Sequence, residues 1–143
     1  MRLSFQTVTL VKKEFETTDI NTCINLLIYG TPIKRITKKI YKRPKPTMFY
    51  IWEHDMTKLQ WISKTKDLRD CRIDIKTISH ISELPTYIKS KAIEKYDSSL
   101  LLSIHYGQNE ELVLLFNDEK MKRDWWCGLQ YFIEEAHNEE RQL

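Results

Sequence analysis

The sequence is short of the residues that build nucleotide-binding loops, disulfide frameworks and metal sites. Its 143 residues include only three glycines, too few for the glycine-rich loop that cradles a nucleotide phosphate. Its three cysteines are spread along the chain without a Cys-x-x-Cys pair, which argues against disulfides and zinc and favours a reducing cytosolic compartment. We therefore interpret Cys23, Cys71 and Cys127 as small apolar residues of a core.

Long apolar runs are missing as well. The chain contains no continuous stretch of about 18 apolar residues, so we expect no transmembrane helix. The first residues, Met1 to Gln6, lack the apolar core of a signal peptide and the Met-Gly start that myristoylation requires. We expect a cytoplasmic domain, and the sequence leaves open whether a native N-terminal lipid anchor precedes it.

Residues of the kinds used in catalysis are few and scattered. The four histidines, His54, His80, His105 and His137, show none of the spacings that place two metal ligands on one helix or hairpin. The Gly-x-Ser-x-Gly motif of a nucleophile elbow is also absent. We expect no catalytic residues, no bound metal and no cofactor, and therefore no enzyme.

Positive charge, by contrast, is concentrated in one stretch, Lys34 to Lys45. Seven of its twelve residues are basic and none is acidic, although the whole chain carries a net charge of only +3. Ile40 and Tyr41 interrupt the cations, and Pro44 and Pro46 close the run. A stretch of this kind favours contact with an anionic surface, above all the headgroups of a membrane.

A helix is predicted on the N-terminal side of this basic stretch. Thr17, Thr18 and Asp19 are good N-cap candidates, and four apolar residues starting at Ile20 fall at i, i+3, i+4 and i+7. This spacing predicts a short amphipathic helix over residues 18–26. Residues 1–17 form an N-terminal extension to which we assign no element.

Strands are predicted on both sides of the basic stretch. We expect one strand to run from Ile33 into the stretch, and residues 48–52 and 58–63 to form a hairpin. Proline donates no ladder hydrogen bond, so residues 43–47 should stay outside a central strand.

The second half of the chain predicts further strands. Residues 72–81 predict a single strand with a bulge near Thr77, and residues 84–97 predict a loop that carries a short helix. Residues 100–106 and 111–116 flank a turn and predict another hairpin.

The last element is a long amphipathic helix capped by Asn117 or Asp118. Its apolar stripe consists of Met121, Trp125, Gly128, Leu129, Phe132 and Ala136. Seven short strands cannot cover their own apolar face at both ends, so this helix should close one end of a bent sandwich or open barrel. We expect Trp125, Leu129 and Phe132 to lie in the core.

This order of elements resembles a pleckstrin homology (PH) domain of the phospholipase C type. The Trp-x-x-Gly-Leu spacing of residues 125–129 is similar to the tryptophan signature in the last helix of that family. The resemblance covers residues 18–137, leaves residues 138–143 as a polar tail, and implies a mainly β, seven-stranded antiparallel fold closed by a C-terminal helix. A narrower likeness is to the acylated PH-domain proteins of apicomplexan parasites, but their lipid-modified first glycine has no counterpart here.

The resemblance also implies a lipid headgroup site. Phosphoinositide-binding PH domains use basic residues of strand one, the following loop and the start of strand two, and the phospholipase C group adds residues after strand three. The residues so implied are Lys34, Arg35, Lys38, Lys39, Lys42, Arg43, Lys45, Lys64 and Lys66. Independently of the resemblance, Ile40 and Tyr41 suit insertion among the headgroups through apolar burial, with packing against the domain's own surface as the open alternative. Lys45 stands where the family motif has arginine, so phosphatidic acid and a phosphoinositide both remain open as ligands.

Two other kinds of partner are alternatives to an anionic membrane. Nucleic acid is disfavoured because the net charge is small and one loop holds most of the cations. A PH-like protein-interaction module without strong lipid binding is the main alternative, with Trp126 or the N-terminal extension as its surface. We expect a monomer that is peripheral on the cytosolic face of a membrane.

Overall fold

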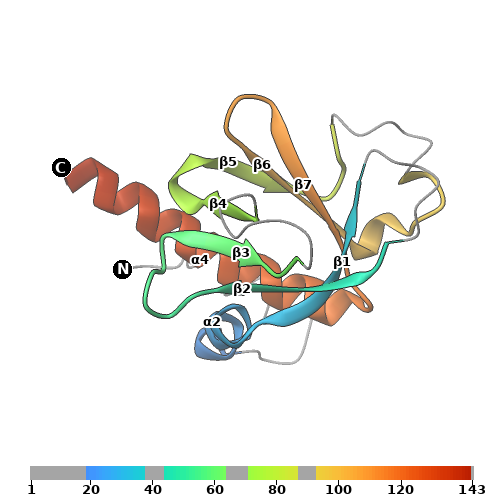
Figure 1. The fold of residues 1–143 in the computed structure, drawn as a ribbon, viewed down its shortest axis with the longest axis horizontal. Coiled ribbons are helices and arrows are strands. Elements are labelled where there is room, and N and C mark those ends of the chain that lie inside the picture. The colour runs from blue at the N-terminus through green and yellow to red at the C-terminus, as the bar shows by residue number, and fades with distance from the viewer. Residues whose placement is uncertain (1–18, 38–43, 64–70, 87–92, 143) are drawn as a thin grey trace.

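A computed structural model describes residues 19–37, 44–63, 71–86 and 93–142. In this part of the chain, seven strands form one antiparallel sheet in the order β4-β3-β2-β1-β7-β6-β5 (Figure 1). The strands are β1 (Thr31–Ile36), β2 (Pro46–Ile51), β3 (Lys58–Trp61), β4 (Arg72–Asp74), β5 (Ile78–Ser82), β6 (Leu101–Tyr106) and β7 (Glu110–Leu115). The helices are α2 (Ile20–Tyr29) and α4 (Glu119–Gln142), and the two 3-10 turns are η2 (Ile75–Thr77) and η3 (Ser98–Leu100).

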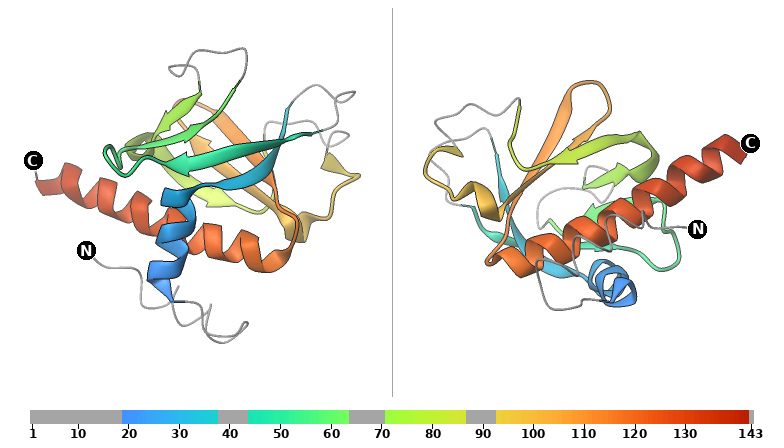
Figure 2. Two further views of the ribbon diagram at one scale, coloured as in Figure 1. Left: turned by 60° about the horizontal axis from the view of Figure 1, so that its bottom comes forward. Right: turned by 180° about the vertical axis from the view of Figure 1, so that it is seen from behind.

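The sheet is strongly bent. Its two edge strands, β4 and β5, are joined by nothing more than the three residues of η2. The edges must therefore come close together, so that the sheet curls into an open barrel with one apolar interior. Figure 2 shows α4 running along one side of this barrel, with α2 lying across it. The predicted fold class, a seven-stranded bent antiparallel sheet closed by a C-terminal helix, is confirmed.

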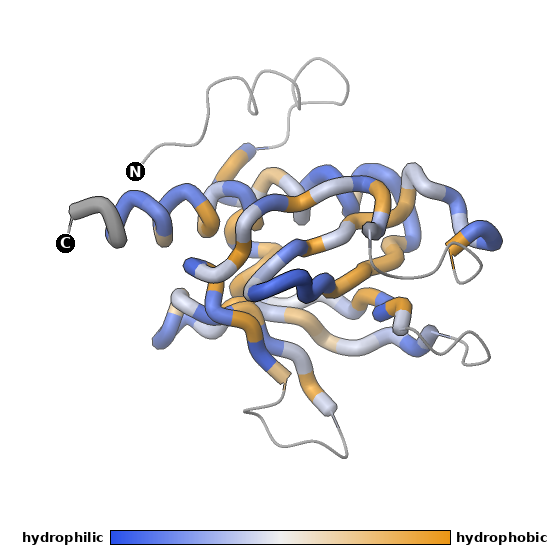
Figure 3. Tube along the Cα trace, turned by 90° about the horizontal axis from the view of Figure 1, so that it is seen from above, coloured by the Kyte–Doolittle hydropathy of each residue, from blue (hydrophilic) through white to orange (hydrophobic). Residues whose placement is uncertain are grey.

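Helix α4 supplies Trp125, the largest fully buried side chain of the core. Asp118 caps it by accepting a hydrogen bond of 2.8 Å from the backbone N–H of Met121. Trp125 and Leu129 are completely buried, and 5% of the Phe132 surface is exposed. Figure 3 shows the apolar positions of α4 recurring between polar ones, the pattern of an amphipathic helix.

Gly128 allows the two helices to approach each other closely. A Cβ atom at this position would lie 2.7 Å from Cδ1 of Leu27 and 2.8 Å from the carbonyl oxygen of Cys23. Both distances are shorter than van der Waals contact, so any larger residue would push α2 away from α4. The glycine of the predicted Trp-x-x-Gly-Leu motif thus has a packing role.

The prediction that residues 43–47 lie outside a central strand is wrong. Strand β2 begins at Pro46, which is paired with Lys34 of β1, and Thr47 is paired with Ile33. Proline is tolerated because it is the first residue of the strand. On the other side, β3 pairs with β2 only from Phe49 onward, so Pro46 needs no ladder partner there.

The prediction of one bulged strand over residues 72–81 is also wrong. The phase slip near Thr77 marks a complete break, where η2 separates β4 from β5. These two strands lie at opposite ends of the strand order. A change of apolar phase is what a chain shows when it leaves one strand ladder and enters another, and the sequence pattern alone does not distinguish this from a bulge.

Other element boundaries differ by a few residues. Helix α2, predicted over residues 18–26, starts after Asp19, one of the three N-cap candidates, and continues to Tyr29. Helix α4 continues to Gln142, through residues assigned to a polar tail. The extension 1–17 and most of the helix predicted within residues 84–97 lie outside the described residues.

A second, smaller apolar cluster lies on the outer side of the sheet. Ile36, Leu101 and Val113 are buried there, from β1, β6 and β7, and the half-buried Ile93 and Tyr96 pack against them. The segment before η3 therefore covers the outer face of the barrel where β1 ends. This cover fixes the C-terminal end of β1, which leads into the basic stretch.

Candidate functional site

A pocket of about 540 Å³ lies where β1, β2 and β3 meet at one end of the barrel. Its lining consists of Arg35, Lys45, Pro46, Thr47, Met48, Trp61, Ile62 and Ser63. The volume falls within the range of about 300–1,000 Å³ that is common for small-ligand sites. The lining joins two of the predicted headgroup-binding residues, Arg35 and Lys45, with the aromatic ring of Trp61.

Arg35 is held in place by its strand and by an aromatic ring. It lies on β1, paired with Leu114 of β7, and its guanidinium carbon is 5.1 Å from the centroid of the Trp61 ring. This is the geometry of a cation–π interaction. Trp61 is itself buried and packs against Phe49, with ring centroids 5.6 Å apart. The positive charge therefore stands on a rigid aromatic base rather than on a free side chain.

Lys45 lines the same pocket from the chain segment that leads into β2. It directly precedes β2 and is exposed.

Lys34, one residue before Arg35 on β1, must point to the opposite face of the sheet because successive strand side chains alternate. Lys34 is accordingly not part of the pocket lining, so the two basic residues of this strand do not act on one pocket.

The other predicted site residues lie outside the described part of the chain. They are Lys38, Lys39, Ile40, Tyr41, Lys42, Arg43, Lys64 and Lys66. Their chain neighbours, however, are part of the pocket. Lys45 lies two residues after Arg43, and Ser63, which lines the pocket, directly precedes Lys64.

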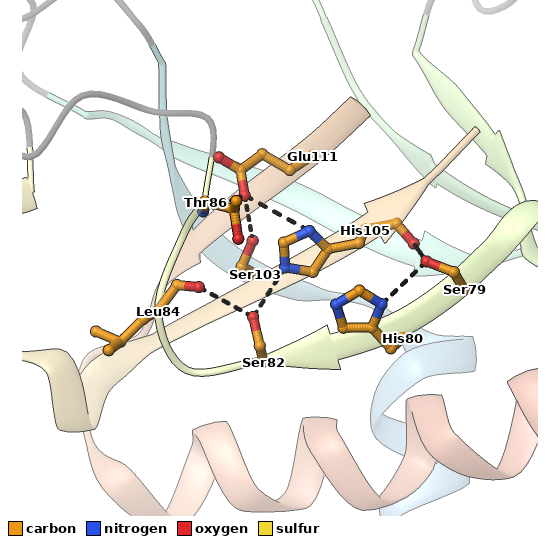
Figure 4. Close-up of polar contacts among 8 residues, drawn as sticks. All are labelled: Ser79, His80, Ser82, Leu84, Thr86, Ser103, His105 and Glu111. Carbon is orange, nitrogen blue, oxygen red and sulfur yellow. Dashed lines mark hydrogen bonds and ion pairs between the residues drawn. The ribbon is translucent and has the colours of Figure 1, made fainter. Parts of the chain in front are cut away.

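A polar cluster on β5, β6 and β7 was missed at the level of the sequence (Figure 4). The rings of His80 and His105 stack with centroids 4.2 Å apart and planes inclined by 9°. Nε2 of His105 lies 2.8 Å from Oγ of Ser82, and Nδ1 lies 3.8 Å from the Glu111 carboxylate. That carboxylate accepts hydrogen bonds from Oγ of Ser103 at 2.9 Å and from the backbone N–H of Thr86 at 3.0 Å.

This cluster holds the chain that follows β5 against the sheet. Oγ of Ser82 donates to the carbonyl of Leu84, and Thr86 is tied to Glu111, so two residues of that segment are anchored. Burial lowers the pKa of the His105 imidazole, neighbouring His80 lowers it further, and Glu111 opposes the shift. The histidines lie 25 positions apart in the sequence, and only the pairing of β5 with β6 brings them together.

The arrangement shows no metal centre in the part of the chain that the structure describes, since no three histidine, cysteine, aspartate or glutamate side chains converge there. All three cysteines are buried and free. Neither described helix is both long enough and apolar enough to cross a bilayer.

Comparison with known proteins places the chain among distant relatives. No protein-family model matches it. It is 29% identical over 137 residues to inactive phospholipase C-like protein 2 of Mus musculus and 28% identical to the protein of the same name from Homo sapiens. In each case the match covers 92% of this chain and 11% of the relative, so the chain spans about a tenth of the length of these proteins.

Solved structures with the same fold are more distant in sequence. Inner Membrane Complex Sub-compartment Protein 1 from Toxoplasma gondii superposes with a TM-score of 0.59 and 14% identity, covering 80% of this chain and 90% of that one. Sub-compartment Protein 3 from the same organism gives 0.56 and 8%, covering 98% and 90%. A structure described as the PH domain from TgAPH gives 0.52 and 11%, covering 90% and 95%.

Proposed function

We propose that this chain, a PH-like domain, is a peripheral membrane module that binds the anionic headgroup of a phospholipid at the cytosolic face of a membrane. The observation that carries the proposal is the fixed position of Arg35, whose guanidinium lies over Trp61 in a pocket that it shares with the exposed Lys45. The headgroup would be that of phosphatidic acid or of a phosphoinositide.

Arginine suits this role because its planar guanidinium donates two parallel hydrogen bonds to a phosphate. A ring below it restricts its orientation, so less side-chain entropy is lost when a phosphate binds. Lysine adds a compact charge with three rotatable donors. The pocket thus offers one directional and one adaptable cation to a phosphate monoester or diester.

Membrane attraction adds to this local contact. Each lysine or arginine near an anionic leaflet contributes about 1 kcal/mol, so Arg35 and Lys45 together would contribute about 2 kcal/mol. The predicted basic residues at 38–43 and 64–66 are joined through a few peptide bonds to the pocket lining. We include them in the proposed site because their charges would raise the attraction to several kcal/mol.

The alternative function, a protein-interaction module, is supported by a different part of the surface. Trp52 and Met56 are about half exposed on the turn between β2 and β3, at the end of these strands remote from the pocket. Trp126, which the sequence predicted as part of a protein-binding surface, is less suited to contact a partner because it is half-buried against the main core. A partner bound at the turn would leave the pocket free.

Vesicle co-sedimentation tests the proposed function. Phosphatidylcholine vesicles alone are compared with vesicles that also contain phosphatidic acid or a phosphoinositide, and an oligonucleotide is titrated in parallel with increasing salt. We expect binding to either or both anionic vesicles and none to neutral ones. Equal binding to neutral and anionic vesicles, or tighter binding to the oligonucleotide, would refute the proposal.

A further inference from the structure

Two buried thiols meet where α2 crosses α4 (Figure 2). Cys23 of α2 is completely buried, and 3% of the Cys127 surface on α4 is exposed. The two residues form a small cluster of their own, against which the half-buried Ile20 packs. Their side chains are in hydrogen-bonding contact. The proposed lipid site uses neither thiol, so their contact calls for a separate explanation.

The close approach of the two helices brings these side chains together. Gly128, the residue after Cys127, has the carbonyl oxygen of Cys23 only 2.8 Å from the position that a Cβ would occupy. The backbones of α2 and α4 are therefore nearly in contact at this point. A disulfide needs Cα atoms about 4.4–6.8 Å apart, a separation that helices reach only where a small residue lets them pack this tightly.

The third cysteine lies in a different environment. Cys71 is as buried as the other two, with 1% of its surface exposed, but it belongs to the main apolar core and not to the cluster of Cys23 and Cys127. Burial alone therefore does not bring cysteines together in this fold. Cys71 provides an internal reference with the same chemistry and the same burial.

A buried carboxylate lies beside the thiol pair. Oδ1 of Asp124, one helical turn before Cys127, is 4.0 Å from Sγ of Cys23, and Oδ2 accepts a hydrogen bond of 2.8 Å from Nζ of Lys120. The carboxylate is thus placed to accept the proton of the Cys23 thiol. The hydrogen bond between the two thiols lowers the pKa of Cys127, and the same bond together with burial raises the pKa of Cys23.

We propose that Cys23 and Cys127 are a redox-active dithiol, which a small hydroperoxide oxidises to a disulfide that joins α2 to α4. The oxidant must be small and uncharged because the pair is buried. The inference does not depend on lipid binding. In the reducing compartment that the cysteine content favours, such a pair is reduced at rest and oxidised transiently.

The reaction has two steps. Cys127, the partly exposed thiol, attacks the hydroperoxide as its thiolate; the O–O bond breaks, an alcohol or water leaves, and the sulfur becomes a sulfenic acid. The sulfur of Cys23 then attacks that sulfur, its proton passes to Asp124, and the hydroxyl leaves as water. Two thiols thereby lose two hydrogen atoms and two electrons, which the hydroperoxide takes up.

Counting thiols after oxidation tests the proposal. The protein is treated with hydrogen peroxide, unfolded in guanidinium and alkylated with N-ethylmaleimide. The reduced chain has three free thiols, and we expect the oxidised chain to keep one, Cys71, with an intact mass lower by two hydrogen atoms. Peptide mapping should recover the Cys23–Cys127 cross-link, and dithiothreitol should restore all three thiols. Three remaining thiols, both after peroxide and after equilibration with oxidised glutathione, would overturn the proposal.

Cysteine variants identify which pair reacts. Cys71→Ala should form the same disulfide and lose both of its thiols, whereas Cys127→Ala should keep Cys23 and Cys71 available for alkylation. A disulfide that includes Cys71, or one that links two chains, would contradict the assignment. Gly128→Ala should slow disulfide formation in the wild-type background, because its Cβ pushes α2 away from α4. An unchanged rate in this variant would contradict helix approach as the basis of the pairing.

Stability gives a second readout. Linking residues 23 and 127 closes a loop of about 100 residues and so lowers the entropy of the unfolded chain. The urea midpoint of the wild type and of Cys71→Ala should therefore rise on oxidation and return with dithiothreitol, while that of Cys127→Ala should not rise. A disulfide that forms but lowers the midpoint would show that it distorts the fold, against the proposal. None of these measurements involves lipid, so their outcome is independent of the proposed function.

Discussion

The indole N–H of Trp125 donates a hydrogen bond of 2.9 Å to Oγ1 of Thr31. The Thr31 hydroxyl in turn donates to the carbonyl of Leu26 at 3.1 Å, which also accepts a hydrogen bond from the backbone N–H of Gly30, the C-cap of α2. Three elements that are distant in the sequence are tied together in this way: α4, the first residue of β1, and the last turn of α2. The strand that carries Arg35 thus starts from a fixed point in the core.

Replacing Trp125 tests this linkage. Trp125→Ala should lower the free energy of unfolding by about 3–5 kcal/mol, as expected when a fully buried aromatic is removed. Trp125→Phe keeps most of the volume and loses the hydrogen bond, so a smaller loss of about 1 kcal/mol beyond the packing change is expected. Urea denaturation measures both. An unchanged midpoint for the alanine variant would contradict the assignment of Trp125 to the core.

Gly128→Ala tests the close contact of α2 with α4. Alanine favours a helix by about 1 kcal/mol over glycine, but its Cβ would meet the backbone oxygen of Cys23 at 2.8 Å. Overpacking of this kind costs about 1–3 kcal/mol, so we expect net destabilisation in urea. Gly107→Asn in the β6–β7 turn is the control, because asparagine tolerates positive φ and the site is open. A more stable Gly128→Ala protein would show that the helices are not in close contact.

Stability should depend on pH through His105. Burial and His80 lower its folded pKa below the unfolded value of about 6.5, so the unfolded chain binds more protons as the pH falls through that value. Stability is then fully present above about pH 6.5 and declines below it, toward the lowered folded pKa. Thermal unfolding between pH 8 and 5 measures the decline.

The His105→Gln variant should flatten this dependence, because glutamine does not titrate. His54→Gln, on the exposed β2–β3 turn, is the matched control and should keep the slope of the wild type. An identical slope in wild type and His105→Gln would show that another group causes the loss of stability on acidification.

The basic segment between β1 and β2 is tested by charge reversal. Lys38→Glu with Lys42→Glu should abolish binding to vesicles that contain phosphatidic acid, because attraction to the leaflet turns into repulsion. Far-ultraviolet circular dichroism should be unchanged. Lys76→Glu, an exposed cation of η2, should reduce binding only slightly. Binding that survives the double reversal would move the site away from this segment.

The fold could be predicted because most of its helices and strands follow from short-range patterns in the sequence. The helical spacing after Asp19 and the apolar stripe of α4 follow from short-range periodicity, and the Trp125 to Leu129 motif adds a specific signal. The resemblance to PH domains, which these features carried, is confirmed at the level of the fold.

What could not be predicted depends on pairing between distant strands. At η2 the chain leaves β4, at one edge of the sheet, and enters β5, at the other edge. In the sequence this change of strand resembles a bulge, because both produce a shift of apolar phase. The roles of Trp61 beneath Arg35 and of His80 beside His105 arise from register. Alternation along β1 even separates Lys34 from Arg35, two neighbours that appeared equivalent in the sequence.

The most direct test of the central claim is the affinity of Arg35→Gln for vesicles that contain phosphatidic acid or a phosphoinositide, set against Lys76→Gln. Both variants remove one positive charge, but only Arg35 lies in the pocket. We predict that Arg35→Gln loses roughly tenfold or more in affinity, as for a charge-assisted contact worth about 1.5–3 kcal/mol, whereas Lys76→Gln stays close to wild type. Equal losses in the two variants would contradict a lipid site at this pocket.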